Sequence, residues 1–598
     1  MTSTQNLSMR NRLWIMPDPD EKIASDLVRR GFNPHVARII ASRGIPLDQI
    51  DDFIEPKIRN LMPDPFALKD MEVGAKRIAR AIQDGQRIGI WSDYDCDGAT
   101  SAAVLGRFLR LCGHEDFKLR IPDRITEGYG PNTPGMLAMK TEHGCDLVCT
   151  LDAGIVAFDP LAAAAQAGIE VIVIDHHMAR ENLPKGVAII NPNRHDDTSG
   201  LGHLCAAGVV FMFSVAVARI LRSEKFFDGK EGRPDRVPDL MSLLDLVALG
   251  TVADVVPLKT LNRAFVRSGT PVLSKRSNPG IKAMAELSGL SVKGEIGETE
   301  CGWRLGPRIN AGGRLADSHL GALLLLEDDP TEAMERAKEL EAINTERRAI
   351  GDKATQEALE QIGPRQPGDR RLAIAVVDAH EGVVGISAGK LKEACDAPAI
   401  VLTQDHGGNL KGSARSVPGF DIGHAIIAAA ENGLITKGGG HGMAGGLSLT
   451  PGQLDGFVAF MNDEIEKSEF AATGVMTQVD LEIPLKDLSP VLVEKLMMSQ
   501  LRPFGTGNPQ PVVQLVGLEL SEIRVLKDTH LKMVLKDGRD TIDALMWGVA
   551  QTEIGERIRS AHGRLVDVIG KVDVNSFRGV DKVQIILDDL RLTPGALL

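Results

Sequence analysis

The sequence is poor in cysteine and in aromatic residues. Its 598 residues include seven cysteines, at positions 96, 112, 145, 149, 205, 301 and 395, and none of them forms a C-x-x-C pair. This spacing excludes a disulfide framework and a zinc site built from paired cysteines, and it is typical of a reducing cytoplasm. Aromatic residues make up 4% of the chain, and the two tyrosines are Tyr94 and Tyr129.

An excess of positive charge and the signals for membrane insertion are also missing. Lys and Arg number 68 against 81 Asp and Glu, so the formal net charge is −13. A protein that coats polyanions is basic, so any binding of nucleic acid here must come from a local cationic groove. The N-terminus lacks the basic-then-apolar pattern of a signal peptide, and no apolar run approaches the length of a membrane span. We therefore expect a cytoplasmic protein with no membrane partner.

The first half of the chain has the pattern of an α/β domain. Hydrophobic content of 43% excludes wholesale disorder, and the length predicts several domains. From residue 88 onward, short apolar runs at 88–91, 147–151 and 171–174 alternate with helical patterns. Strands that alternate with helices predict a parallel sheet. A charged surface loop at 223–238 and a buried helix at 240–250 follow.

The second half contains one long helix and two further domains. Residues 330–361 predict a charged connecting helix that ends before a G-P-R-Q-P-G-D-R linker. A second α/β unit follows, with strands at 372–377 and 399–402. Five short strands after residue 510 predict a small β-barrel, with an OB-fold as the leading candidate. We predict five parts: an N-terminal segment 1–55, a catalytic domain 56–325, a connecting helix 326–365, an α/β domain 366–470 and an OB-fold domain 475–598.

Carboxylates and histidines follow the strands of the first α/β domain. They are Asp93, Asp95 and Asp97 in D-Y-D-C-D-G, Asp152 in T-L-D-A-G, and His176 and His177 in D-H-H, which begins at Asp175. A fourth cluster is Asp254, a carboxylate inside the apolar segment V-A-D-V-V-P-L. In an open parallel sheet, ligands bind outside the carboxyl ends of the strands, so we expect these clusters to converge.

Such a collection of acidic groups predicts a metal centre. Crowded carboxylates repel one another unless a cation neutralises them. Asp oxygens favour Mg²⁺ and Mn²⁺, and imidazole shifts the preference toward transition metals, so the mixed set predicts Mn²⁺ or Mg²⁺, with two ions. Two ions suit phosphoryl chemistry. A single Asp after a strand is more often a helix cap, and the prediction therefore depends on all four clusters together.

The motifs together resemble the DHH phosphoesterase superfamily, and within it the RecJ family of single-stranded-DNA-specific exonucleases. The resemblance runs from about residue 50 to the C-terminus. The segments that carry it are the D-H-H triplet at 175–177, and residues 246–258, 304–315, 380–389, 438–446 and 502–513. It implies a DHH domain, a DHHA1 domain and an OB-fold, in agreement with the division predicted above.

The resemblance also implies which residues act at the site. The implied metal ligands are Asp95, Asp97, Asp152, His176 and Asp254, with Asp93 and His177 close by. Hydrolysis is expected near Asp152 and His176, with His441 aimed at the scissile group. Some related phosphoesterases use a histidine just before the first motif, but Trp91 and Ser92 stand there in this chain. The ligand set of one ion is therefore left open.

Several basic segments are candidates for holding phosphates. Arg304, Arg308, Asn310 and Arg314 lie in a glycine-rich stretch that we interpret as a turn, from which arginines can clamp phosphates. An ordinary solvated loop is the alternative. By resemblance, Ser413 and Arg415 hold a 5′-terminal phosphate together with Arg124. Gly440 and His441 begin a G-x-G-x-x-G pattern, but no clear strand opens a βαβ unit there, which argues against dinucleotide binding.

The barrel is expected to grip the substrate without taking part in the chemistry. Its candidate stacking residues are Phe504, Trp547 and Phe577, each of which could instead be a core residue. Its candidate cations are Arg502, Arg524, Lys527, Lys532 and Arg578. Because every implied ligand precedes residue 255, we expect a chain lacking residues from about 475 onward to retain slow metal-dependent cleavage.

The favoured function is a 5′→3′ exonuclease that degrades single-stranded DNA to mononucleotides in recombination and repair. Its expected partners are single-stranded DNA, a single-strand-binding protein and a helicase, and we expect a monomer. One alternative is a DHH phosphodiesterase acting on short oligonucleotides or cyclic dinucleotides, whose members generally lack the barrel. Another is a non-catalytic DHH scaffold, which would be expected to lose carboxylates that this chain retains.

Overall fold

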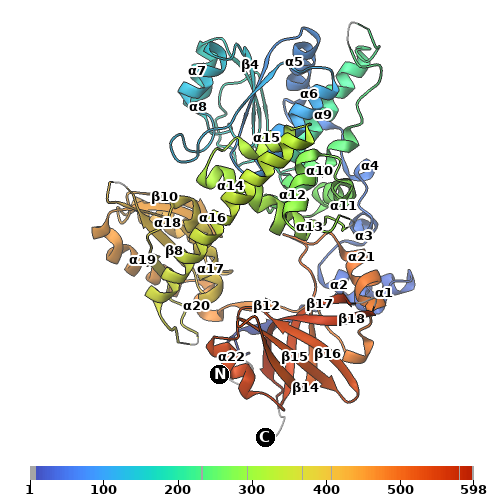
Figure 1. Cartoon of the computed structure of the whole chain (residues 1–598), viewed down its shortest axis with the longest axis vertical. Coiled ribbons are helices and arrows are strands. Elements are labelled where there is room, and N and C mark those ends of the chain that lie inside the picture. Colours follow the sequence, from blue (N-terminus) through green and yellow to red (C-terminus); the bar gives the residue numbers. More distant parts are fainter. Residues whose placement is uncertain are drawn as a thin grey trace. The chain divides into compact units, whose positions relative to one another are not determined.

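The computed structural model describes residues 8–230, 233–292, 294–366, 368–405, 407–577 and 580–594 (Figure 1). The chain divides into two compact units. Unit 1 comprises Met1–Gln49, Arg348–Leu501 and Gln510–Leu598, and unit 2 comprises Ile50–Arg347 and Arg502–Pro509. The short last segment of unit 2 is therefore separated in sequence from the rest of that unit by more than a hundred residues.

A five-stranded parallel sheet lies at the centre of unit 2, in the order β3-β2-β4-β5-β6. The strands are β2 (Ile88–Ser92), β3 (Phe117–Arg120), β4 (Leu147–Leu151), β5 (Glu170–Ile174) and β6 (Ala188–Ile190). Strands β2 and β4 are buried along their whole length, as expected for a sheet covered on both faces. The predicted parallel α/β architecture is confirmed.

Two apolar layers cover the two faces of this sheet. Alternate strand residues such as Ile90 and Ile172 join the main core with helices α5 (Met71–Gln83), α6 (Cys96–Leu111), α9 (Ala206–Ser223), α10 (Leu244–Ala253) and α11 (Thr260–Lys275). Their neighbours Trp91 and Val173 face a smaller core with α7 (Thr133–Thr141) and α8 (Phe158–Gln166). Figure 1 shows α7 and α8 on the side of β4 away from α5 and α6. Because successive side chains of a strand point to opposite faces, each strand contributes apolar residues to both layers.

Helix α9 is long and apolar enough, by length and composition, to cross a membrane, with a mean hydropathy of 1.6 over 18 residues. The expectation that no apolar run approaches this length was wrong. The physical reason is its place in the fold, because 78% of the helix is buried inside unit 2. A helix that is apolar on all sides is typical of a protein core as well as of a membrane span.

The remaining helices of unit 2 lie before and after the strands in the chain, and one of them departs from the predicted pattern. They are α3 (Ile50–Ile54), α4 (Ile58–Leu61), α12 (Pro279–Leu287), α13 (Glu298–Glu300), a π-helical turn (Cys301–Leu305), α14 (Gly306–Leu315) and α15 (Leu320–Leu326). The glycine-rich stretch predicted as a turn is therefore helical. Its glycines permit close packing, because a Cβ on Gly313 would lie 2.4 Å from the carbonyl oxygen of Tyr94.

Unit 1 contains a second sheet, in the order β10-β11-β9-β8-β7. Its strands are β7 (Ala373–Val376), β8 (Ala399–Gln404), β9 (Leu410–Arg415), β10 (Lys437–His441) and β11 (Ala444–Leu449). The helices beside it are α17 (Glu381–Cys395), α18 (Ile422–Glu431), α19 (Leu454–Glu466) and the second half of α16 (Pro330–Ile362). Strands β7 and β8 are parallel and the other pairs are antiparallel. The glycine-rich strands β10 and β11 were not predicted, because glycine gives no apolar alternation.

Five strands form the predicted barrel, also in unit 1. They are β14 (Val512–Leu526), β15 (His530–Asp537), β16 (Asp540–Met546), β17 (Leu565–Phe577) and β18 (Val580–Leu592), with α22 (Glu553–Ser560) after β16. Pairing of β14 with β17 closes the barrel. The N-terminal part adds α1 (Glu21–Arg29), α2 (Pro34–Ser42) and β1 (Leu13–Ile15), which pairs in parallel with β12 (Met476–Gln478).

Two residues assigned to the barrel belong elsewhere. Arg502 and Phe504 lie in the segment Arg502–Pro509, which is part of unit 2. Residues beyond 475 therefore contribute to unit 2 as well as to the barrel. The physical reason is long-range packing, which no local pattern reports. Arg578 and the side chain of Phe577 lie outside the described residues.

Two helical glycines provide a test of the packing. A Cβ on Gly269 in α11 would lie 2.2 Å from the carbonyl oxygen of Leu244 in α10, whereas a Cβ on Gly351 in α16 meets no atom within 4 Å. We expect Gly269→Ala to lower the free energy of unfolding by about 1–3 kcal/mol, because the helices must separate. Gly351→Ala should raise it by roughly 0.5–1 kcal/mol. Urea unfolding followed by circular dichroism measures both, and effects of the same sign would contradict the packing.

Candidate metal centre

The predicted clusters converge at the carboxyl end of the unit 2 sheet. Asp95 is the N-cap of α6, and its carboxylate accepts hydrogen bonds from the backbone of Asp97 (2.9 Å) and Gly98 (3.0 Å). Asp152 follows β4 with a positive φ of 57°. The D-H-H triplet follows β5, so three strand ends deliver their side chains to one place, as predicted. Asp254 differs, because it caps the C-terminus of α10 and follows no strand.

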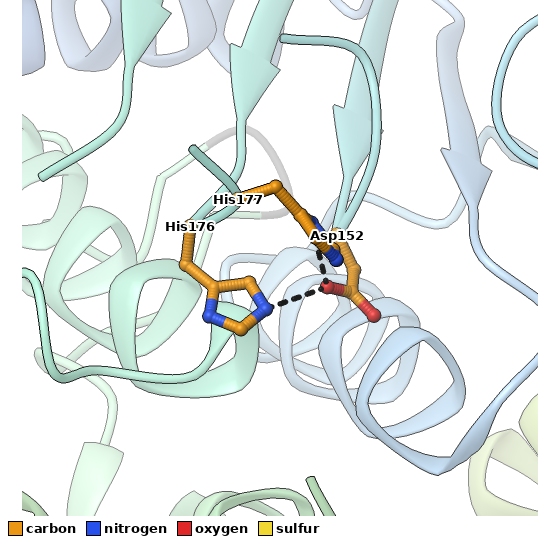
Figure 2. Close-up of side chains that lie close together, drawn as sticks. All are labelled: Asp152, His176 and His177. Atoms are coloured by element: carbon orange, nitrogen blue, oxygen red, sulfur yellow. Dashed lines mark ion pairs between the residues drawn. The ribbon is translucent and has the colours of Figure 1, made fainter. Parts of the chain in front are cut away.

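His176 is the centre of the cluster. Its Nε2 lies 3.2 Å from Asp152 Oδ1, 3.7 Å from Asp254 Oδ2 and 3.9 Å from Asp97 Oδ2. Figure 2 shows both histidines beside Asp152, with His177 Nδ1 at 3.8 Å from the same Oδ1. Among the described residues, three groups hold their possible ligand atoms within 4.8 Å of one another: Asp152, His176 and His177; Asp97, His176 and Asp254; and Asp93, Asp95 and Asp152.

The orphaned atoms of this cluster fit a divalent cation. Buried polar atoms in proteins almost always have hydrogen-bond partners. Within the described part of the chain, four buried atoms here make no hydrogen bond: Asp93 Oδ1, Asp152 Oδ1, His176 Nε2 and Asp254 Oδ2, the second and third of which are in ion-pair contact. Carboxylate oxygens and one imidazole nitrogen are ligands that suit Mn²⁺ and Mg²⁺. The donor set therefore fits the predicted metal.

The carboxyl groups are held at a high electrostatic cost. Burial, and then the charge of Asp95, raises the pKa of Asp93 well above its usual value. Burial and the neighbouring carboxylates likewise raise the pKa of Asp152, and they raise the pKa of Asp254 to about 9. Without a cation these groups favour the protonated form, whereas a bound cation stabilises their charges.

Backbone groups orient the ligands from behind. His176 Nδ1 lies 3.0 Å from the carbonyl oxygen of Leu204, and donation to that carbonyl leaves the lone pair of Nε2 free for a metal. Asp97 accepts hydrogen bonds from the backbone of Ala206 (2.6 Å) and Ala207 (3.0 Å), at the N-terminus of α9. The helix dipole favours a carboxylate at this end.

The first residue of the D-H-H triplet orients the third. Asp175 Oδ1 lies 2.8 Å from His177 Nδ1. Burial lowers the pKa of His177, but the hydrogen bond and charge of Asp175 outweigh it and raise that pKa to about 9. Burial likewise opposes ionisation of Asp175, yet its contacts with His177 keep the pKa of Asp175 below its ordinary value. Asp175 is thus a positioning residue, which agrees with its absence from the implied ligand set.

Three residues that support the site were not assigned a role from the sequence. The Tyr129 hydroxyl lies 3.0 Å from the carbonyl oxygen of Asp152 and 3.1 Å from His177 Nδ1. Asn191 Nδ2 donates to the carbonyl of His177 at 2.9 Å, and Asn193 Nδ2 donates to the carbonyl of His176. Both asparagines follow β6, so the strand-end rule that found the acidic clusters also applies to I-I-N-P-N.

The basic stretch 304–314 is tied into unit 2. Arg304 donates to the carbonyl oxygen of Ser288 (2.8 Å), and Arg308 forms an ion pair with Glu341. Asn310 Oδ1 accepts from the backbone of Cys96 at 2.7 Å, so it braces the first acidic motif.

Two further arginines lie beside that motif. The guanidinium of Arg124 lies over the ring of Tyr94, 5.0 Å from its centroid, and its charge acts to lower the pKa of Asp93. The charge of Arg314 acts on the same tyrosine.

The remaining candidates gather on neighbouring strands of unit 1. Arg415 on β9 pairs with Ala444 on β11, which pairs in turn with His441 on β10. Arg415 also donates to Ser413 Oγ at 2.9 Å. A Cβ on Gly440 would lie 2.3 Å from the carbonyl oxygen of Ala444, so the tight hairpin requires glycine there. This β-hairpin agrees with the argument against a dinucleotide fold.

Within the barrel, three of the predicted binding residues are described with their neighbours. Trp547 is 53% exposed and lies edge-on to His530. Arg524 pairs with Glu522 and Lys532 pairs with Asp543, each at 2.8 Å. A phosphate that binds either cation would therefore have to replace the carboxylate with which it is paired in this structure.

The raised pKa values predict how metal binding depends on pH. A protonated carboxyl must lose its proton before it can bind a cation, so the affinity for Mn²⁺ should rise as the pH approaches about 9. A raised pKa also means that the metal-free fold loses stability as the pH rises from the ordinary carboxyl range through this value. The increase in the unfolding midpoint caused by Mn²⁺ should therefore grow with pH. A pH-independent increase, measured by calorimetry, would contradict this.

Comparison with known proteins agrees with this geometry. Family models match the DHH family N-terminal domain at residues 87–251, the DHHA1 domain at 369–467 and the RecJ OB domain at 479–589. The chain is 33% identical over 585 residues to the single-stranded-DNA-specific exonuclease RecJ of Bacillus subtilis, covering 96% of this chain and 70% of that protein. It is 33% identical over 571 residues to the Escherichia coli protein of the same name, covering 93% and 96%.

Solved structures show the same relationship. The chain matches the crystal structure of RecJ from Thermus thermophilus in complex with Mn²⁺ at a TM-score of 0.78 and 26% identity, over 98% of this chain and 80% of that one. A second structure of that protein, in complex with Mg²⁺, matches at a TM-score of 0.72 and 25% identity, over 98% and 79%. The chain belongs to the RecJ family of the DHH phosphoesterase superfamily.

Proposed function

We propose that this protein is a metal-dependent exonuclease specific for single-stranded DNA. It degrades strands in the 5′→3′ direction to 5′-mononucleotides and acts in recombination and repair. The observation that carries the proposal is the set of four orphaned buried ligand atoms, in a chain 33% identical to two single-stranded-DNA-specific exonucleases. A scaffold without catalysis would gain nothing from burying unneutralised carboxylates at this cost.

The metal ligands in this proposal are Asp93, Asp95, Asp97, Asp152, His176, His177 and Asp254, which would hold two ions of Mn²⁺ or Mg²⁺. When bound, such ions polarise the phosphate and lower the pKa of water. Asp152 and His176 each belong to two of the three ligand groups, so both lie at the centre of the proposed site. In the metal-free site Asp175 raises the pKa of His177 to about 9, so His177 would have to lose its proton before it could serve as a ligand.

The phosphate backbone would be held by separate groups in each unit. In unit 1, Ser413 and Arg415 would bind the 5′-terminal phosphate, beside Gly440 and His441 on the neighbouring strands. This preference for a strand end sets the polarity. In unit 2, the proposed phosphate-binding residues are Arg124, Arg304, Arg308, Asn310 and Arg314. Because the net charge is −13, such local cations have to supply the attraction.

The same proposal extends to the organisation and setting of the protein. The domain limits predicted above remain our proposal, except that Arg502–Pro509 packs in unit 2, and the barrel is an additional single-strand grip. We further propose that the protein is a monomer in the cytoplasm, with a single-strand-binding protein and a helicase as partners. The location is supported by seven free cysteines, six of them buried, which suit a reducing compartment.

Strands labelled at the 5′ or 3′ end test the activity directly. With Mn²⁺ or Mg²⁺, the protein should release labelled mononucleotides at once from 5′-labelled single strands and late from 3′-labelled ones, and should leave duplexes intact. Asp152→Ala should abolish hydrolysis and keep the fold, because Asp152 lies at a strand end outside the apolar core. Duplex cleavage, or turnover by Asp152→Ala close to that of the original protein, would refute the proposal.

Arg415→Ala tests the proposed site for the terminal phosphate. A guanidinium that pairs with this phosphate contributes only when the phosphate is present. We therefore expect the variant to digest 5′-phosphorylated strands more slowly, with a smaller effect on 5′-hydroxyl strands. Steady-state rates on the two substrates measure the difference. Equal slowing of both would place Arg415 elsewhere along the strand.

A further inference from the structure

The segment Arg502–Pro509, with the sequence R-P-F-G-T-G-N-P, is an inserted part of unit 2. The chain on either side of it belongs to unit 1. The backbone of Phe504 donates to Glu298 Oε1 at 3.1 Å and ties the segment to the rest of unit 2, and within the segment Asn508 Nδ2 donates to the carbonyl of Pro503 at 2.7 Å. The family model of the RecJ OB domain spans these residues, yet they pack with the domain that carries the carboxylates.

The segment packs directly against the loop that follows Asp254. The carbonyl oxygen of Thr506 accepts a hydrogen bond from the backbone of Leu258 at 2.7 Å. A Cβ on Gly505 would lie 2.7 Å from Leu258 Cδ1, and a Cβ on Gly507, whose φ is +75°, would lie 3.3 Å from Pro257 Cβ. Both glycines therefore let the segment lie close to Pro257 and Leu258, and a larger residue at either position would push the segment away from this loop.

A buried arginine fixes the other end of the segment. Arg263 is 1% exposed, and its guanidinium donates to the carbonyl oxygens of Arg502 (2.7 Å) and Pro503 (3.1 Å). The same group donates to the carbonyl of Phe53 and lies 4.0 Å from the centroid of its ring. Removing the segment would take two acceptors from a buried charge, which is strongly destabilising.

The loop that contacts the segment is connected to two of the proposed metal ligands, Asp254 and His176. Pro257 and Leu258 follow Asp254 closely in sequence. The buried Asn262 donates through Nδ2 to the carbonyl of Pro257 (3.0 Å) and to that of His203 (2.5 Å). The next residue after His203 is Leu204, whose carbonyl oxygen orients His176. A connected series of contacts therefore runs from the segment to both Asp254 and His176 and supports their positions.

We propose that Arg502–Pro509 is a positioning segment of the metal site, which holds Asp254, and through Asn262 also His176, in the geometry that binds the ion. This rests on the metal-binding role given to these residues under the proposed function. Supporting groups behind metal ligands commonly change affinity by about 10–100-fold. A chain that lacks residues from about 475 onward would then lose metal affinity as well as grip on DNA.

Two glycines with a positive φ provide a matched test. Gly507 has a φ of +75° and Gly538, in a turn of the barrel, has a φ of +60°, but a Cβ on Gly538 meets no atom within 4 Å. Valine at either position suffers similar backbone strain, so the pair separates strain from contact with Pro257. We expect Gly507→Val to weaken Mn²⁺ binding by roughly tenfold or more, and Gly538→Val to leave it unchanged.

The measurement is the dissociation constant of Mn²⁺, obtained from the free-ion electron paramagnetic resonance signal of the full-length protein without DNA. Thermal unfolding without metal is the control for folding. If Gly507→Val does not fold, Gly505→Ala replaces it, because its Cβ meets only the flexible side chain of Leu258. Equal Mn²⁺ affinity in a folded variant and in the original protein would overturn the proposal.

A double-mutant cycle with Asp254→Asn distinguishes positioning from a general loss of stability. If the segment acts through Asp254 and His176, its substitution should cost less Mn²⁺ affinity once Asp254 is replaced than it costs in the original protein. Purely additive losses would overturn the proposal. The Mn²⁺ measurements contain no DNA, so they decide the role of the segment independently of cleavage. Failure of the protein to cleave single strands would refute the proposed function alone.

Discussion

The mutual repulsion of buried carboxylates is the constraint on which the rest of unit 2 depends. Asp93, Asp97, Asp152 and Asp254 share a space from which water is largely excluded, and burial raises the pKa of each. Such an arrangement persists only if the surrounding fold is stable enough to enforce it and a cation is available to neutralise it. The apolar strands and the largely buried helices supply the first condition, and the orphaned ligand atoms indicate the second.

The ligands themselves occupy little of the fold, and most of the neighbouring polar groups serve to orient them. The carbonyl of Leu204 sets the ring of His176, and Asp175 sets the ring of His177. Asn310 holds the backbone of the first acidic motif. The segment Arg502–Pro509 adds a contribution from the last third of the chain. The proposed catalytic domain is therefore discontinuous in sequence, and its metal affinity should depend on residues far from any ligand.

Local patterns succeeded where a single physical signal dominated. The strands β2, β4 and β5 were predicted to within a residue or two, because a strand buried on both faces is an uninterrupted apolar run. The prediction failed where glycine replaced that signal. Gly306, Gly312 and Gly313 suggested a turn but lie in helix α14, where they permit close packing, and the glycine-rich strands β10 and β11 were missed. In both cases tertiary contacts overrode the weak intrinsic preference of glycine.

The sequence by itself determined the parallel sheet, the barrel, the acidic clusters and their convergence, because strand ends in a parallel sheet share one edge. Only the tertiary structure decided that Asp254 reaches His176 from a helix end, that Asn310 braces a motif more than two hundred residues away, and that Arg502–Pro509 belongs to unit 2. The reason is physical: periodicity reports which face of an element is buried, whereas the partner it is buried against depends on shape and hydrogen bonding between distant segments.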